Sequence, residues 1–113
     1  MLKGIDNRLN ADLLGCLRAM GHGAMLMLVD ANFPASSLAA QTVAGKVLTM
    51  ENLTATEAAR AILSLLPLDT FVPDFAGRME VVGDPARITD VQAEVQAVVD
   101  AAEGRPRPLP GIE

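Results

Sequence analysis

The pattern of apolar and polar positions along the chain predicts three well-marked helices. The first begins after Asn10, a good N-terminal cap, and stops at Gly21. Two more begin with a Thr followed three residues later by Glu or Gln, at positions 54–57 and 89–92, which is the pattern of a capping box. One of these ends at Pro67, and the other covers about 90–102 with its stop at Gly104. The predicted buried stripes are Leu13, Leu14, Leu17 and Met20; Ala58, Ala59, Ile62, Leu63 and Leu66; and Val91, Val95, Val98 and Val99.

Three other segments predict strands. Residues 25–29 form an unbroken apolar run, so the strand that we expect over 24–29 should be buried on both faces of a sheet covered by helices. Residues 46–50 predict a second strand. Residues 78–82 predict a short third one, closed by the turn-forming residues 83–85. The hydropathy pattern therefore predicts an α/β domain.

The remaining segments predict connections. Residues 31–44 are small and polar, which is typical of a functional loop or a short, weakly apolar helix. Residues 68–76 predict an extended connection, in which Asp69 is interpreted as a turn residue after Pro67. Residues 105–110 are too rich in proline for a helix or a central strand, and we expect a polyproline-like connection, with a recognition motif as the alternative.

Composition narrows the class of protein. A chain of 113 residues predicts one domain, 1–113. Its 50% apolar content becomes about 58% with the nine glycines, above the usual 45–50%, which predicts apolar surface buried between subunits of a homo-oligomer. A net charge of −5 argues against nucleic acid as a partner. No apolar run is long enough for a membrane span or signal peptide, so we expect no membrane partner and a cytoplasmic location.

Candidate chemistry gathers around the first predicted strand. His22 is the only histidine, lies between two glycines just before the strand, and can both accept and donate a proton at neutral pH. Asp30 ends the strand, where α/β sheets bind ligands. Structural alternatives exist for both, because a histidine just past a helix C-terminus is favoured by the helix dipole and an aspartate here can form a turn with Asn32.

Other reactive residue types have structural interpretations. Cys16, the single cysteine, lies in the first helix and is better explained as a small buried apolar residue than as a nucleophile. Phe33 is better explained as core packing than as an aromatic platform for a sugar. No metal-ligand spacing is present, so no metal and no cofactor is expected.

Several motifs together resemble the L-fucose mutarotase and D-ribose pyranase family. They are the opening residues 1–5, Met-Gly-His-Gly at 20–23, Asp-Ala-Asn-Phe-Pro-Ala at 30–35, Leu-Pro-Leu-Asp at 66–69 and Val-Val-Gly-Asp at 81–84. The resemblance implies a three-layer, Rossmann-like fold with a mostly parallel sheet and helices on both faces. It also implies isomerase activity on a free monosaccharide such as L-fucose or D-ribose, no cofactor, and a pentamer or decamer.

The resemblance also implies roles for particular residues. His22 falls on the catalytic proton donor and acceptor, and Asp30 on a sugar-binding residue; Asn32 is a second candidate for sugar binding. Family members continue past Glu113 with an Arg-Phe-Ala-Phe-Tyr segment and closing strands, which this sequence lacks. The alternative function is therefore a shortened, non-catalytic protein that binds a monosaccharide or forms rings.

Overall fold

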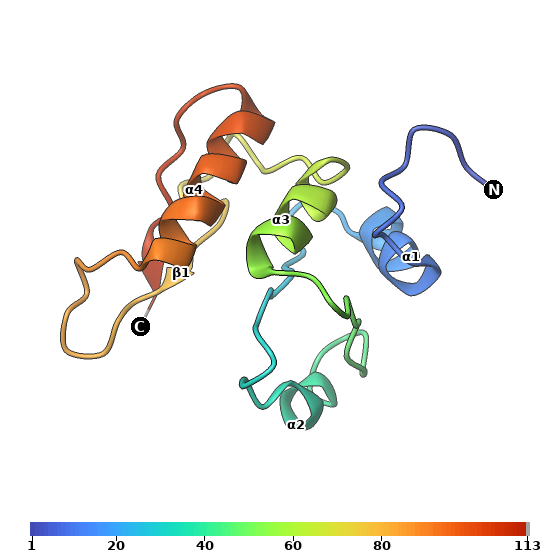
Figure 1. Cartoon of the computed structure of the whole chain (residues 1–113), viewed down its shortest axis with the longest axis horizontal. Helices are drawn as coiled ribbons and strands as arrows, with labels where there is room; N and C mark the ends of the chain where they lie inside the picture. Colours follow the sequence, from blue (N-terminus) through green and yellow to red (C-terminus); the bar gives the residue numbers. More distant parts are fainter. Residues whose placement is uncertain (113) are drawn as a thin grey trace.

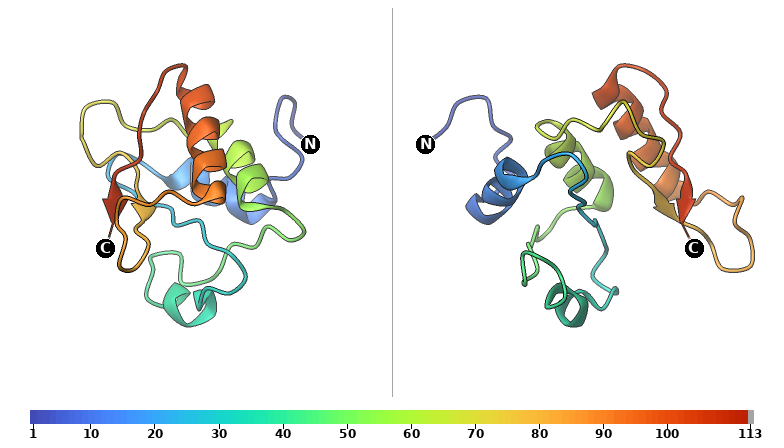
Figure 2. Two further views of the ribbon diagram at one scale, coloured as in Figure 1. Left: turned by 60° about the vertical axis from the view of Figure 1, so that its left-hand side comes forward. Right: turned by 180° about the vertical axis from the view of Figure 1, so that it is seen from behind.

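The computed structural model, which describes residues 1–112, contains four helices and a small parallel sheet in the order α1, α2, α3, β1, α4, β2 (Figure 1). Their bounds are α1 Ala11–Ala19, α2 Ala35–Ala39, α3 Ala55–Leu63, β1 Arg78–Met79, α4 Asp90–Glu103 and β2 Gly111–Ile112. Figure 2 shows α2 set apart from the other three helices in both views. The coarse prediction of an α/β domain is confirmed.

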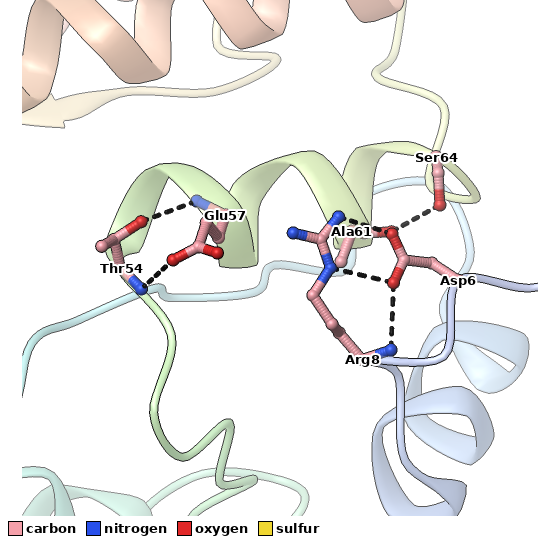
Figure 3. Close-up of polar contacts among 6 residues, drawn as sticks. All are labelled: Asp6, Arg8, Thr54, Glu57, Ala61 and Ser64. Atoms are coloured by element: carbon pink, nitrogen blue, oxygen red, sulfur yellow. Dashed lines mark hydrogen bonds and ion pairs between the residues drawn. The ribbon is translucent and has the colours of Figure 1, made fainter.

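Local side-chain chemistry sets where the helices begin. Asn10 caps α1 by accepting a hydrogen bond from the N–H of Leu13, at 2.9 Å. At α3 the Thr54 hydroxyl accepts from the Glu57 N–H at 3.1 Å, and the Glu57 carboxylate accepts from the Thr54 N–H at 3.0 Å (Figure 3). This reciprocal pair confirms the predicted capping box, and its backbone hydrogen bond from Thr54 lowers the pKa of Glu57.

The start of α4 is confirmed by the same chemistry, since Thr89 and Gln92 exchange hydrogen bonds of 3.2 and 3.0 Å. Its end is confirmed at Gly104, whose φ of +70° is left-handed backbone that favours glycine. The other two helices stop earlier than predicted. A backbone turn to extended geometry at Met20 ends α1 before Gly21, and α3 ends at Leu63 before Pro67.

The core lies between α1, α3 and the chain that precedes α1. Its buried members are Leu9, Leu13, Ala61 and Ile62. Helices α3 and α4 lie side by side (Figure 1), and the small buried residues Ala58 and Ala59 on α3 allow a close approach. Of the predicted stripe on α4, Val98 and Val99 are buried, Val95 is partly buried, and Val91 is 52% exposed, so the last assignment is wrong. Val91 lies in the first turn of α4, where the partner helix does not cover it.

The strand predicted over residues 24–29 is not formed within the described chain, and neither is the one over 46–50. Both segments lack regular secondary structure and have no neighbouring strand. Leu26 packs on the core, while Met25 and Met27 on either side of it are 87% and 66% exposed. Burial on both faces was therefore a wrong expectation for this chain, because an unbroken apolar run does not show which of its faces finds a partner.

The short strand predicted over residues 78–82 is confirmed in part, as β1. β1 pairs in parallel with β2, with Arg78 opposite Gly111 and Met79 opposite Ile112, and the following turn is closed by the Asp84 N–H donating to the Val81 carbonyl at 3.0 Å. The short, weakly apolar helix that was one alternative for residues 31–44 is confirmed as α2. No helix of the described residues is long and apolar enough to cross a membrane.

Candidate functional site

His22 lies just beyond α1 in a loop whose conformation depends on glycine. Gly23 has φ of +82°, a left-handed conformation that an L side chain rarely adopts, so this position favours glycine. The His22 side chain is 80% exposed. A reacting molecule in solvent can therefore reach the imidazole directly.

The closest polar partner of His22 is Asp69, from the loop after α3. The distance from His22 Nδ1 to Asp69 Oδ1 is 2.7 Å, and the Asp69 side chain is 24% exposed. With a proton on Nδ1, the imidazole donates to the carboxylate and leaves the lone pair of Nε2 free to accept a proton. A carboxylate here also stabilises the imidazolium that forms when Nε2 takes that proton.

Sequence reasoning missed this role of Asp69. The two residues are 47 positions apart, so the spacing gives no local signal of their contact. The available signal was the Leu-Pro-Leu-Asp motif at 66–69, which the family resemblance includes but which was interpreted only as a turn. Tertiary packing, not local turn geometry, brings its carboxylate to the histidine.

One aromatic ring borders the pair. The ring centroid of Phe71 lies 5.0 Å from that of His22, with 74° between the ring planes, an edge-to-face arrangement. Phe71 is 67% exposed and so offers an apolar surface beside the imidazole. From the sequence, Phe33 was the aromatic residue considered as a platform for a sugar, because it is closer in sequence to His22.

Asp30 and Asn32 form a local turn. Asp30 Oδ1 accepts hydrogen bonds from the N–H groups of Asn32 and Phe33, at 3.0 and 3.2 Å. The turn-forming interpretation of Asp30 is thus seen directly, and both side chains are exposed. Within the described residues, no hydrogen bond or ion pair joins Asp30 or Asn32 to His22; the contact with the imidazole belongs to Asp69.

The remaining candidates stay outside this cluster. Cys16 is partly exposed on α1, which differs from the fully buried position expected, because the core covers α1 mainly at Leu13. In residues 1–112 no three His, Cys, Asp or Glu side chains gather into a possible metal site. The arrangement of His22, Asp69 and Phe71 is suited to proton transfer on a ligand with an apolar face.

Comparisons with known proteins identify a family and several relatives of this chain. Residues 3–111 match the model of the RbsD / FucU transport protein family. Curated relatives named fucose mutarotase include those of Homo sapiens, 38% identical over 99% of this chain and 73% of the relative, and of Bos taurus, 34% identical over 90% and 67%. The Mus musculus relative is 43% identical over 72% of this chain and 52% of its own length.

A solved structure supports the same relationship. The crystal structure of protein Atu2016, described as a candidate sugar binding protein, is 56% identical and superposes with a TM-score of 0.95 over 100% of this chain and 75% of that chain. The matches to the three mutarotases named above span between about half and three quarters of those relatives' length. The family match across nearly the whole sequence and these identities show that the chain belongs to the RbsD / FucU family.

Proposed function

We propose that this protein is an isomerase that interconverts the anomers or ring forms of a free monosaccharide, with L-fucose as the first substrate to test and D-ribose as the second. The observation that carries the proposal is the 2.7 Å contact between His22 and Asp69, which leaves the other imidazole nitrogen available for proton transfer. The mutarotase names of the relatives support the substrate class.

The reaction needs only proton transfers. Nε2 of His22 takes the proton from the anomeric hydroxyl while the ring oxygen receives a proton from solvent water, and the bond between the anomeric carbon and the ring oxygen breaks. Rotation about the bond between C1 and C2 presents the other face of the carbonyl. On closure the hydroxyl attacks the carbonyl carbon and returns its proton to the hydroxide left in solvent, while the imidazolium returns its proton to the carbonyl oxygen, which gives the opposite anomer. Asp69 orients the imidazole and balances its transient charge.

The surrounding residues have proposed roles in holding the sugar. Phe71 is a largely exposed aromatic ring beside the imidazole, and the faces of such rings pack on the apolar faces of sugars. Asp30 and Asn32 are exposed polar residues that the family resemblance places at the sugar. Because Asp30 uses Oδ1 for its turn, its Oδ2 is the atom that we assign to a sugar hydroxyl.

Assembly and the wider sheet belong to the same proposal. The exposed side chains of Met25, Met27 and Leu28 form an apolar surface that a second copy of the chain would cover, which supports a homo-oligomer, a pentamer or decamer in the family expectation. The mostly parallel, three-layer sheet is proposed for that assembled form, in a cytoplasmic protein.

Exchange NMR on the anomeric protons of L-fucose and D-ribose tests the function. His22→Gln should slow the catalysed exchange by about 10²- to 10⁴-fold, the usual contribution of a general acid and base. Asp69→Asn should slow it at least tenfold, because a neutral amide cannot balance the imidazolium. Asp74→Asn is the matched control, since Asp74 is an exposed carboxylate of the same loop, and it should leave the rate unchanged.

A second candidate function is sugar binding without catalysis. The 56% identity to a protein described as a candidate sugar binding protein favours it as the alternative. Saturation-transfer NMR would then detect bound fucose or ribose while anomer exchange stays at the uncatalysed rate. A loss of less than about threefold in His22→Gln would also make the histidine structural and remove the catalytic proposal.

A further inference from the structure

Arg107 is a buried charged residue in an otherwise exposed segment. It is 7% exposed, whereas Arg105, Pro106 and Pro108 around it are exposed. Burying a guanidinium is costly unless its donors are all well placed. Arg107 is therefore one of the points at which the segment after α4 is held against the protein, and its partners indicate what the burial does.

The partners of Arg107 belong to two separate parts of the fold. Nη1 donates to Glu103 Oε1 at 2.5 Å, which fixes the side chain to the last turn of α4. Nη2 donates to the backbone carbonyl of Asp69 at 2.6 Å, and the guanidinium carbon lies 3.7 Å from the centroid of the Phe75 ring. The guanidinium thus connects α4 to the loop that carries Asp69.

The backbone of Arg107 is also held by hydrogen bonds. The Arg107 N–H donates to Asp100 Oδ1 at 2.8 Å, and its carbonyl accepts from Gln96 Nε2 at 2.8 Å. Both partners lie on α4. The position of Arg107 is therefore set by a regular helix rather than by the proline-rich segment alone.

The loop that Arg107 holds has little structure of its own. Residues 67–77 contain no helix or strand, and no hydrogen bond between backbone groups of the described chain involves them. The Asp69 carbonyl and the Phe75 ring are held by Arg107 instead. The carboxylate of the same Asp69 contacts His22, so a shift of this loop would move the carboxylate away from the imidazole.

We propose that Arg107 is a positioning residue, which holds Asp69 against His22 by fixing the backbone of the loop. The inference rests on the proposed function only where it concerns turnover. The contact that Arg107 maintains is a property of the chain without any sugar. Arg107 touches neither His22 nor, in this proposal, the reacting atoms.

Long-range ¹H–¹⁵N NMR of the His22 ring tests the proposal, because it reports which nitrogen carries the proton in the neutral imidazole. In the unsubstituted chain, the Asp69 carboxylate should favour the proton on Nδ1. Arg107→Met should shift the population toward a proton on Nε2, in the same direction as Asp69→Asn, which removes the carboxylate itself. Arg105→Met, an exposed arginine two residues away, should leave the population unchanged.

Arg107→Lys keeps the experiment decisive if the methionine variant unfolds. Its charge remains available to Glu103, but a single ammonium does not provide the two-armed, planar contact that reaches both Glu103 and Asp69. We expect a smaller shift in the same direction. Circular dichroism of each variant confirms that α4 is retained.

Kinetics give the second readout. For L-fucose, Arg107→Met should lower kcat by about 10- to 100-fold with KM within about twofold, since a misplaced base affects turnover more than binding. Proton positions on His22 that match the unsubstituted chain in every folded Arg107 variant would overturn the proposal. Absence of catalysed anomer exchange in the unsubstituted chain as well as in the variants, together with the expected NMR shift, would instead overturn the proposed function and leave this inference standing.

Discussion

Two regions of this chain are similarly apolar in sequence but differ in how far their side chains are buried. Around α1 and α3, the apolar side chains of Leu9, Leu13 and Ile62 are buried in a shared core. In residues 25–28, equally apolar side chains remain on the surface, and only Leu26 packs inward. The helices satisfy their own backbone hydrogen bonds and need only one covered face, whereas an extended segment needs neighbours along its edges as well. An apolar sequence therefore occurs both in the buried core around α1 and α3 and in an exposed segment suited to a partner.

The largest expected effect on the free energy of unfolding is in the buried core around α1 and α3. Leu13 is 2% exposed, and Leu13→Ala should lower the free energy of unfolding by about 2–5 kcal/mol because it leaves a cavity beside α3. Met25→Ala, at an 87% exposed position, should change it by less than about 0.5 kcal/mol. Urea denaturation at low protein concentration measures both values. Equal losses at the two positions would remove the distinction between the regions.

A charge in the exposed apolar segment sharpens the same comparison. Met27→Glu should reduce the assembly of copies, because an unpaired carboxylate in an interface is costly to desolvate, while the unfolding of the isolated chain changes by less than about 0.5 kcal/mol. Sedimentation velocity at micromolar concentration gives the mass of each variant. A monodisperse monomer before any substitution would contradict the proposed homo-oligomer.

The smallest expected effect is the loss of folding stability at acid pH, which depends on two carboxylates near α1 and α3. Asp6 accepts hydrogen bonds from the Arg8 side chain (Figure 3), which lower its pKa from 3.8 to about 2, and the N–H of Thr54 lowers the pKa of Glu57. A carboxyl whose pKa is lower in the folded chain stabilises the fold above its unfolded pKa. That contribution is lost as the pH falls from about 4 to about 2.

Urea midpoints measured between pH 5 and pH 2 check this expectation. Asp6→Asn should flatten the lower part of the pH dependence, since the amide does not titrate. Asp12→Asn is the control, because Asp12 also lies in an ion pair, 3.3 Å from the ammonium of Lys46, but both side chains of that pair are exposed. An unchanged pH profile in Asp6→Asn would show that the Asp6–Arg8 pair does not contribute to stability.

The sequence by itself determined where three of the four helices begin and which family the chain resembles. Asn10, Thr54 and Thr89 specify where three helices begin, because each cap acts within three residues of itself. His22 could be singled out as a candidate for a similar reason, since a lone histidine between two glycines can be recognised from neighbouring residues. The family motifs are likewise read in order along the chain.

Only the tertiary structure decided which distant groups meet. Asp69 reaches His22 across 47 positions, and Arg107 reaches the Asp69 carbonyl across 38, so neither contact has a periodicity or spacing that reveals it. It also decided that residues 24–29 have only one covered side. Local patterns report what a segment can bury or cap, whereas the partner that buries it depends on where the rest of the chain folds.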